Sequence, residues 1–365
     1  MNDIENGQPV RPEAPSGGRR RFLAAGVAAG VVSAGAAPAA QAQAQAQAKT
    51  QTQVQTRGPG GIVSTDHWTS KKADGRDLKL FIRRKRLRVE SAIPKRGTIL
   101  FVHGSSMAGT PVFDLNVPGK PEYNTMDRFA RLGYDTWCLD HEGYGRSDKS
   151  RNVNFDIATG ADDLDAVSQY IIKNGGGPKL LMYGLSSGAL RAALFTERHP
   201  ERVSRLVLDA YVWTGEGSPT LANRKKRLDE WRSANRRPID NAMVQSIFTR
   251  DHPGTADPAV VNAFAEAILA LDNSVPTGTY VDMSANLPVN DPLKIPVPTM
   301  IMRGEFDGIA GFQDIANFFV KLPNPDKQFV VMRGIAHSSL HEKNYAIVYH
   351  ALEAFFGQPA PVYTG

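Results

Sequence analysis

The sequence predicts an α/β fold built on a mostly parallel central sheet that is flanked by helices. Two observations support this expectation. From residue 61 onward, short apolar runs of strand length alternate with segments of helical periodicity, which is typical of a parallel sheet covered on both faces. The interval 214–295 interrupts the alternation and contains only predicted helices and loops. We therefore expect a helical cap inserted after the sixth strand, over the sheet edge where ligands bind in such folds.

The composition excludes several other classes of protein. Of 365 residues, 41% are hydrophobic and 22% are charged, which excludes disorder of the whole chain. No stretch of about 18 strongly apolar residues occurs, which excludes a polytopic membrane protein. The single cysteine, Cys138, excludes an intramolecular disulfide and a cysteine-cluster zinc site. Basic and acidic residues are interspersed, 43 against 37, so we expect no nucleic-acid partner.

The N-terminal segment has a composition of its own. Three arginines at 19–21 precede Phe22-Leu23 and a run rich in Ala, Gly and Val, an order that resembles a twin-arginine export signal. We expect residues 1–42 to be this signal peptide and 43–60 to be a disordered Gln/Ala/Thr-rich tether. The expected partner is the twin-arginine export machinery, and the expected location is the periplasm or the exterior, with no stable membrane span after processing.

The core elements are predicted in chain order. Residues 78–82 alternate and lead into a basic run at 83–88, which predicts an early edge hairpin whose charges face solvent. Further strands are expected at 98–102, 134–139, 179–183, 203–208, 299–302 and 328–332. Core helices are expected at 126–132, 161–172, 189–195, 312–320 and 344–356, and cap helices at 220–234, 240–248 and 259–271. The two parts of the core then span 61–213 and 296–365.

A single motif indicates the chemistry. Gly184-Leu185-Ser186-Ser187-Gly188 directly follows a predicted strand and precedes a helix of small residues, which is the setting of a nucleophile elbow. The flanking glycines are expected because so sharp a turn leaves no room for Cβ atoms beside the serine. Ser186 is therefore the candidate nucleophile.

A serine hydroxyl needs an adjacent base, and the base needs an acid to orient it. His337 follows the last predicted strand and is the candidate base, with His341 as the alternative. Asp307 follows the strand at 299–302 and is the candidate acid. Its rivals are Glu305 and Asp209. The order Ser, Asp, His is the one expected after such an elbow.

An oxyanion hole completes the expected site. One donor should be the backbone N–H of Ser187, the residue after the nucleophile. The other should be the N–H of Ser105, in the loop after the strand at 98–102, with Ser106 as the alternative. His103 precedes this loop and is expected to orient it through a hydrogen bond.

These residues together carry a resemblance. From residue 62 to its end the chain resembles the capped branch of the α/β-hydrolase superfamily. The matching pieces are His103-Gly104, Asp140-x-x-Gly143-x-Gly145-x-Ser147, the elbow, Gly304-x-x-Asp307 and His337. The resemblance argues against epoxide hydrolases and haloalkane dehalogenases, which carry Asp in place of Ser186. It disfavours proline iminopeptidases, because no Gly-Gly-Pro-Gly stretch follows His103. His141 stands near a position where relatives often have an arginine, either in the loop or at the rim of the site.

The resulting hypothesis is an exported serine hydrolase, most simply a carboxylic ester hydrolase acting through an acyl-enzyme. Its substrate would be a small-molecule ester, and we expect neither a metal nor an organic cofactor. The alternatives are hydrolysis of an amide, a lactone or a β-diketone C–C bond with the same residues, or a non-catalytic ligand-binding relative. Cofactor-free perhydrolase or haloperoxidase chemistry is expected only as a side activity.

One basic stretch in the cap allows two interpretations. It comprises Arg224, Lys225, Lys226 and Arg227, followed by Arg232, Arg236 and Arg237. We expect a solvated helix face with acidic partners such as Asp229 and Glu230. Attraction of an anionic substrate, for instance a half-ester of a dicarboxylic acid, is the alternative.

Overall fold

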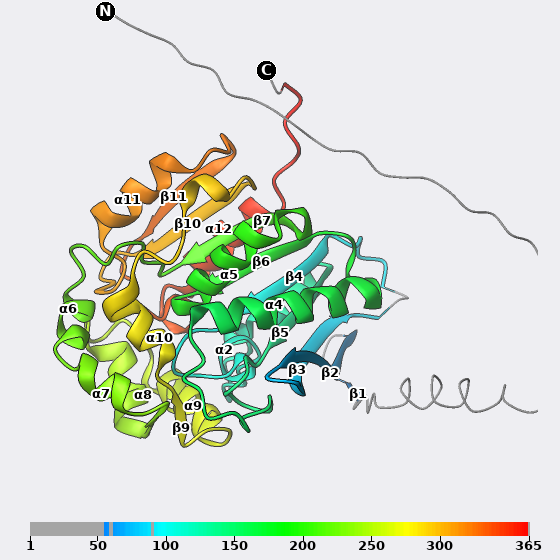
Figure 1. Cartoon of the computed structure of the whole chain (residues 1–365). Coiled ribbons are helices and arrows are strands. Elements are labelled where there is room, and N and C mark those ends of the chain that lie inside the picture. The colour runs from blue at the N-terminus through cyan, green and yellow to red at the C-terminus, as the bar shows by residue number, and fades with distance from the viewer. Residues whose placement is uncertain (1–54, 58–60, 89–90, 364–365) are drawn as a thin grey trace, which may run out of the picture. The chain divides into compact units, whose positions relative to one another are not determined.

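The computed structural model describes residues 55–57, 61–88 and 91–363, and a nine-stranded sheet organises them (Figure 1). Its order is β1-β2-β3-β5-β4-β6-β7-β10-β11. The strands are β1 Gln55–Arg57, β2 Ile62–Ala73, β3 Arg76–Leu87, β4 Gly97–Val102, β5 Tyr134–Leu139, β6 Leu180–Leu185, β7 Val203–Asp209, β10 Thr299–Gly304 and β11 Lys327–Met332. The strands from β5 to β11 in this order run parallel, whereas β1, β2 and β3 pair in antiparallel fashion. The expected parallel sheet is therefore confirmed.

Helices cover both faces of the sheet. The core helices are α2 Gly109–Phe113, α3 Thr125–Arg131, α4 Ile157–Ile171, α5 Ser187–Arg198, α11 Phe312–Lys321 and α12 Tyr345–Phe356. One face packs on α4, α5 and α11, and the other packs on α2, α3 and α12. Short helical turns complete the core at Pro121–Tyr123, Ile172–Gly176, Pro200–Arg202 and Ser339–His341.

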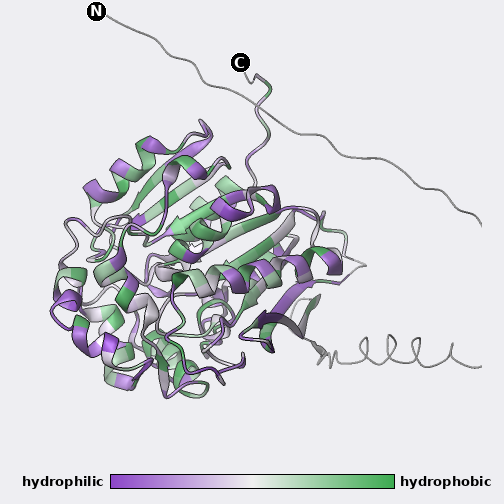
Figure 2. Ribbon diagram, viewed as in Figure 1, coloured by the Kyte–Doolittle hydropathy of each residue, from purple (hydrophilic) through white to green (hydrophobic). Residues whose placement is uncertain are grey.

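The central strands are apolar on both sides, as a doubly covered sheet requires. In β4, Ile99 and Phe101 pack into one hydrophobic core while Leu100 and Val102 pack into the other. All four are fully buried. Figure 2 shows hydrophobic residues concentrated on the central strands and hydrophilic ones on the β2–β3 hairpin, while helix α4 carries both kinds. Burial on two faces explains the continuous apolar runs.

The cap follows β7 and returns at β10. It holds α6 Pro219–Lys225, α7 Leu228–Ser233, β8 Arg236–Pro238, α8 Asn241–Thr249, α9 Pro258–Leu269, β9 Ser274–Pro276 and α10 Gly278–Val281. Turns at Asp282–Asn286 and Pro292–Lys294 lead back to the core. The strands β8 and β9 form a small antiparallel ribbon that the sequence patterns did not predict.

The single helix expected over 220–234 is wrong, since α6 and α7 are separate helices. The indole N–H of Trp231 donates to the backbone carbonyl of Arg224, 3.2 Å away, near the end of α6. Trp231 is buried edge-on against Tyr280. Burying this indole requires a change of chain direction that local periodicity does not reveal.

Two further expectations need correction. The tether predicted over 43–60 is wrong at residues 55–57, which form β1 and pair with β2 in antiparallel fashion. The basic run of the hairpin does not simply face solvent, because Arg83, Arg84 and Lys85 are ion-paired and largely buried. The predicted signal peptide (residues 1–42) and the rest of the tether (residues 43–54 and 58–60) lie outside the described residues.

No helix in the described part of the chain is both long and apolar enough to cross a membrane.

A substitution at Asp114 tests whether the ion pairs of the β2–β3 hairpin stabilise the fold. Its carboxylate accepts from the guanidinium of Arg83 at 2.7 Å and from the side-chain amide of Asn124 at 2.8 Å, and it also pairs with Lys85. We expect Asp114→Asn to lower the free energy of unfolding by about 1–3 kcal/mol, because the largely buried cations of Arg83 and Lys85 each lose one of their two carboxylate partners and retain only Asp66 and Asp127. Urea denaturation measures the change. Asp162→Asn is the matched control, since Asp162 pairs with Arg198 in an exposed position, and it should cost less than about 1 kcal/mol. Equal effects of the two variants would contradict the assignment.

Candidate active site

Ser186 sits in a strained turn between β6 and α5. Its φ is 58° and its ψ is −126°, a backbone conformation that residues other than glycine rarely adopt. A Cβ on Gly184 would lie 2.6 Å from Cα of Ala189, and one on Gly188 would lie 2.3 Å from the carbonyl oxygen of Val102. The predicted steric reason for both glycines is thus confirmed by the geometry. The turn leaves the Ser186 hydroxyl at the N-terminus of α5.

The structure brings Ser186, His337 and Asp307 together. Nε2 of His337 lies 3.0 Å from Oγ of Ser186, and its Nδ1 lies 3.0 Å from Oδ1 of Asp307. Oδ1 of Asp307 also accepts from the backbone N–H groups of Ile309 and Ala310. Burial alone would raise the pKa of Asp307, but His337 and these N–H groups hold it below its usual value. The carboxylate is therefore ionised and able to hold the Nδ1–H tautomer of His337.

The alternatives considered for these roles are engaged elsewhere. The carboxylate of Glu305 accepts from the backbone N–H of Gly334 at 2.8 Å. That of Asp209 accepts from the hydroxyl of Tyr183 at 2.5 Å and from Ser339, and its burial raises its pKa to about 6. The imidazole of His341 lies 2.9 Å from the carbonyl oxygen of Val112. Asp307 and His337 are thus the pair that reaches Ser186.

His103 orients the loop that carries Ser105. Its Nε2 accepts from the backbone N–H of His141 at 2.9 Å, so its proton is on Nδ1, which donates to the carbonyl oxygen of Gly104 at 2.8 Å. Burial lowers the pKa of His103 and keeps it neutral. The hydroxyl of Ser105 donates to that of Ser187 at 2.7 Å. The two expected oxyanion residues are therefore linked side by side, and Ser187 occupies the first turn of α5, whose N–H groups have no partner within the helix.

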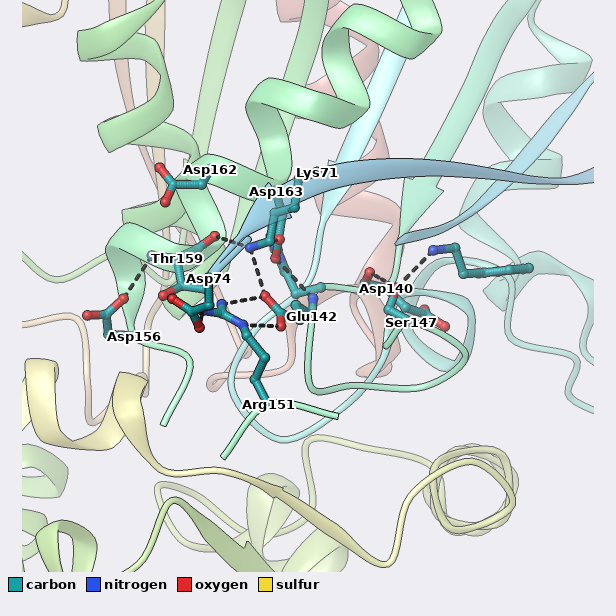
Figure 3. A network of polar contacts seen from close by, with 12 residues as sticks. Lys71, Asp74, Asp140, Glu142, Ser147, Arg151, Asp156, Thr159, Asp162 and Asp163 are labelled. Carbon is teal, nitrogen blue, oxygen red and sulfur yellow. Dashed lines mark hydrogen bonds and ion pairs between the residues drawn. The ribbon is translucent and has the colours of Figure 1, made fainter. Parts of the chain in front are cut away.

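A buried ionic network surrounds Glu142 and Asp163 (Figure 3), and it connects to His103 through the backbone N–H of His141. Lys71 of β2 pairs with Glu142 at 2.9 Å and with Asp163 at 2.6 Å, and Arg151 forms two 2.7 Å hydrogen bonds with Glu142. Asp163 also lies 3.0 Å from Nδ1 of His141. Placement of His141 at the rim of the site is wrong, since it is buried in this network.

The sequence patterns missed Glu342. Its two carboxylate oxygens accept from the backbone N–H groups on either side of His337, those of Ala336 at 2.6 Å and Ser338 at 3.0 Å. The residue is fully buried. It fixes the loop that presents His337, and no motif marks it in the sequence.

Cap side chains close the space above Ser186. The remaining cavity is about 30 Å³, and it is lined by Gly104, Ser105, Ser106, Met107, Leu185, Ser186, Arg224, Ile247, Arg250, Tyr280, His337 and Ser338. The guanidiniums of Arg224 and Arg237 each lie 4.1 Å from the ring centre of Tyr280. The expected solvated helix face is therefore wrong for Arg224 and Arg237, although Arg227 does pair with Glu230 at the surface.

Tyr280 has an unusual acidity. Burial would raise its pKa, but the neighbouring Arg224 and Arg237 outweigh this effect and lower it to about 7. Its hydroxyl lies 3.5 Å from that of Ser106. A tyrosinate in the same cavity as Ser186 is thus accessible near neutral pH.

One group of described residues has the donor spacing of a metal site. Asp251, Asp307 and His337 each place one donor atom within 4.8 Å of the others. Because His337 and Asp307 bind each other and Ser186, we assign this group to the hydrogen-bonded triad. Asp251 accepts from the hydroxyl of Thr220 at 2.9 Å.

Residues 120–344 match the protein family described as "Serine aminopeptidase, S33". This region includes Ser186, Asp307 and His337 and the whole cap.

Solved structures share the fold at low sequence identity. A thermophilic esterase from Thermogutta terrifontis is 19% identical with a TM-score of 0.56, covering 80% of this chain and 99% of its own. A soluble variant of monoglyceride lipase from Saccharomyces cerevisiae is 18% identical with a TM-score of 0.57, covering 79% and 93%. A hydrolase from Pseudomonas aeruginosa is 16% identical with a TM-score of 0.58, covering 80% and 98%. The likeness identifies the α/β-hydrolase fold.

The acidity of Tyr280 is open to a direct titration. We expect the near-ultraviolet absorbance of tyrosinate to rise with a midpoint near pH 7, and Tyr280→Phe to remove this step. Because the folded-state pKa is below the usual 10, ionised Tyr280 stabilises the fold fully above pH 10, and the contribution is lost as pH falls through about 7. As pH rises from 7 to 10, the free energy of unfolding of the native protein should therefore increase relative to that of Tyr280→Phe. If the first tyrosinate step coincides in the two proteins, the lowered pKa is wrong.

Proposed function

Since the chain belongs to the α/β-hydrolase family described as serine aminopeptidase S33, we propose that it is a serine hydrolase that acts on carboxylic esters. The observation that supports this most directly is the pair of 3.0 Å contacts joining Ser186, His337 and Asp307 at a strained elbow. A nucleophile, a base and an orienting acid in series are what acyl transfer requires.

The proposed reaction starts at Ser186. Its hydroxyl attacks the ester carbonyl while Nε2 of His337 takes the proton, and Asp307 stabilises the resulting imidazolium. The backbone N–H groups of Ser105 and Ser187 stabilise the tetrahedral oxyanion. His337 then protonates the leaving alcohol. A water molecule, activated by the same histidine, hydrolyses the acyl-enzyme and restores Ser186.

The lining of the cavity favours esters over the aminopeptidase reaction that the family description names. An aminopeptidase binds a cationic α-amino group, for which a carboxylate is the natural partner. Among the described residues that line the cavity, Arg224 and Arg250 are charged and no carboxylate occurs. Repulsion between these guanidiniums and an ammonium group would weaken such a substrate. Hydrolysis of a lactone, an amide or a β-diketone C–C bond by the same three residues is the alternative proposal.

Export is a separate proposal that rests on sequence alone. The arginines at 19–21, the apolar run after them and the small residues beyond are the order of a twin-arginine signal. A folded enzyme with one cysteine is suited to export into an oxidising compartment. We therefore propose a periplasmic or secreted hydrolase.

Ser186→Ala tests the nucleophile. We expect the variant to lower kcat on p-nitrophenyl esters by at least ~10³-fold, because no other group replaces the attacking oxygen, and to abolish labelling by a fluorophosphonate probe. Steady-state kinetics and intact mass measure the two effects. Ser233→Ala, at an exposed serine of α7, is the control and should behave like the native protein. Retained turnover in Ser186→Ala would refute the proposal, and native protein inert to both ester and probe would favour a non-catalytic relative.

The acid is tested by a matched pair of neighbouring carboxylates. Asp307→Asn should lower kcat by about 10⁴-fold, because an amide in that place favours the wrong histidine tautomer. Glu305→Gln should leave kcat within a few-fold of the native value, because Glu305 reaches only the backbone of Gly334. The same ester assay compares both. If Glu305→Gln lowers kcat more than Asp307→Asn does, Glu305 and not Asp307 is the acid that orients His337.

A further inference from the structure

The cap places an unusual concentration of positive charge beside Ser186. Arg224 comes from α6 and Arg237 from β8, and both guanidiniums stack on the ring of Tyr280. Arg250, at the end of α8, lines the same cavity as Arg224 and Ser186. Three separate cap elements thus each contribute one arginine to the region around Tyr280 and the cavity.

These cations are poorly compensated within the described part of the chain. Neither Arg224 nor Arg237 forms an ion pair with any described carboxylate, and Arg250 reaches only Asp251, at 3.5 Å. Arg237 is 7% exposed, and its Nε is buried without a hydrogen-bond partner among the described residues. A guanidinium removed from water without a full counter-charge is costly, and Tyr280 offers one negative charge at most to the two guanidiniums that stack on it. The arrangement therefore favours the arrival of an anion from outside the protein.

These guanidiniums lie close to the place where the carbonyl group of a substrate would react. Nη2 of Arg237 donates to the hydroxyl of Ser106 at 2.6 Å, and Ser106 follows the expected oxyanion residue Ser105. Arg224, Arg250 and Tyr280 share the lining of the cavity with Ser186 and His337. A cavity of about 30 Å³ holds little more than one water molecule. Substrate must therefore displace side chains of the lining, among which the guanidiniums of Arg224 and Arg250 are the charged groups from the cap.

We propose that the preferred substrate is an ester that carries a free carboxylate, such as a half-ester of a dicarboxylic acid, and that this carboxylate binds Arg224 in the cavity lining, with Arg237, which reaches the lining through Tyr280 and Ser106, adding the second cation. The proposal rests on the proposed ester hydrolysis and names its substrate class. A guanidinium presents parallel N–H donors that match a carboxylate. Ionised Tyr280 supplies at most one negative charge, so the cluster stays cationic when the ligand arrives.

The other cap arginines do not share this environment. Arg227 is exposed, pairs with Glu230 and stacks on Trp231. Arg232 is exposed on α7 and joins no ion pair or side-chain hydrogen bond with another described residue. The basic stretch therefore divides into a solvated part and a part that faces the site, and Arg232 provides a matched control of equal charge.

The test compares two substrates that differ in one charge. The full-length protein is assayed with the mono-p-nitrophenyl ester of adipic acid and with the corresponding p-nitrophenyl methyl adipate, in which the second carboxylate is capped. We expect kcat/KM to be ~10-fold or more higher for the half-ester, the effect of one charge-assisted contact. Hydrolysis of both at equal rates would overturn the carboxylate site and leave ester hydrolysis standing. Hydrolysis of neither, with no probe labelling of Ser186, would refute the proposed function itself.

Variants locate the effect. Arg224→Gln and Arg237→Gln should each reduce the ratio of the two kcat/KM values by about 10-fold, mainly through KM for the half-ester. Arg232→Gln removes the same charge from the cap and should leave the ratio at the native value. A drop of the same size in Arg232→Gln would overturn the site in favour of general electrostatic attraction.

A binding measurement covers the case in which a variant folds poorly. Adipate should inhibit hydrolysis of the neutral ester by the native protein competitively, and it should raise the midpoint of the Tyr280 titration, because a second anion beside the arginines disfavours the tyrosinate. Inorganic phosphate serves as the comparison anion. Adipate that neither inhibits nor shifts the midpoint, or phosphate that binds more tightly, would overturn the assignment of a carboxylate.

Discussion

The site depends on a close approach between the end of β4 and the turn that carries Ser186. A Cβ on Gly188 would meet the carbonyl oxygens of Val102 at 2.3 Å and His103 at 2.5 Å, and one on Gly104 would lie 3.2 Å from that of Leu185. Only glycine permits this contact, and the contact places the loop of Ser105 directly against the first turn of α5. The strained backbone of Ser186 costs about 1–3 kcal/mol, which the buried packing of β4, β6 and α5 offsets.

Parallel pairing then assembles the remaining groups. Strands β6, β7, β10 and β11 are neighbours in the sheet and end at the same edge, so Ser186, Asp307 and His337 meet although they lie far apart in sequence. The intervening β7 contributes Asp209, whose backbone carbonyl accepts from the N–H of Ser186 at 2.8 Å. Asp209 supports the elbow from below while Asp307 reaches the histidine. The carboxylate of Asp209 is bound by Tyr183 and Ser339 instead, so this residue holds the elbow through its backbone, whereas Asp307 acts through its carboxylate.

Local patterns predicted what local physics determines. Each parallel strand of the core was predictable from its apolar run, and the elbow from its glycines, because burial on two faces and lack of space leave few residue types. The start of α4 was missed although its cap is a local signal, the side chain of Asp156, which accepts from the N–H of Thr159. Glu342 and Tyr280 were missed for another reason. Their roles depend on contacts across the tertiary structure, and a lone glutamate or tyrosine carries no pattern of its own.

The cap arginines show where such reasoning stops. A basic stretch on a helix is equally compatible with solvent and with a binding site, and only the direction of each side chain separates the two. Arg227 faces Glu230 at the surface, whereas Arg224, three residues earlier, stacks on Tyr280 in the cavity that Ser186 lines. The cost of holding Arg237 buried without a carboxylate is then a property of the unliganded enzyme. A ligand that brings its own anion removes this cost, so binding energy that the cap stores as unpaired charge is released only with the right substrate.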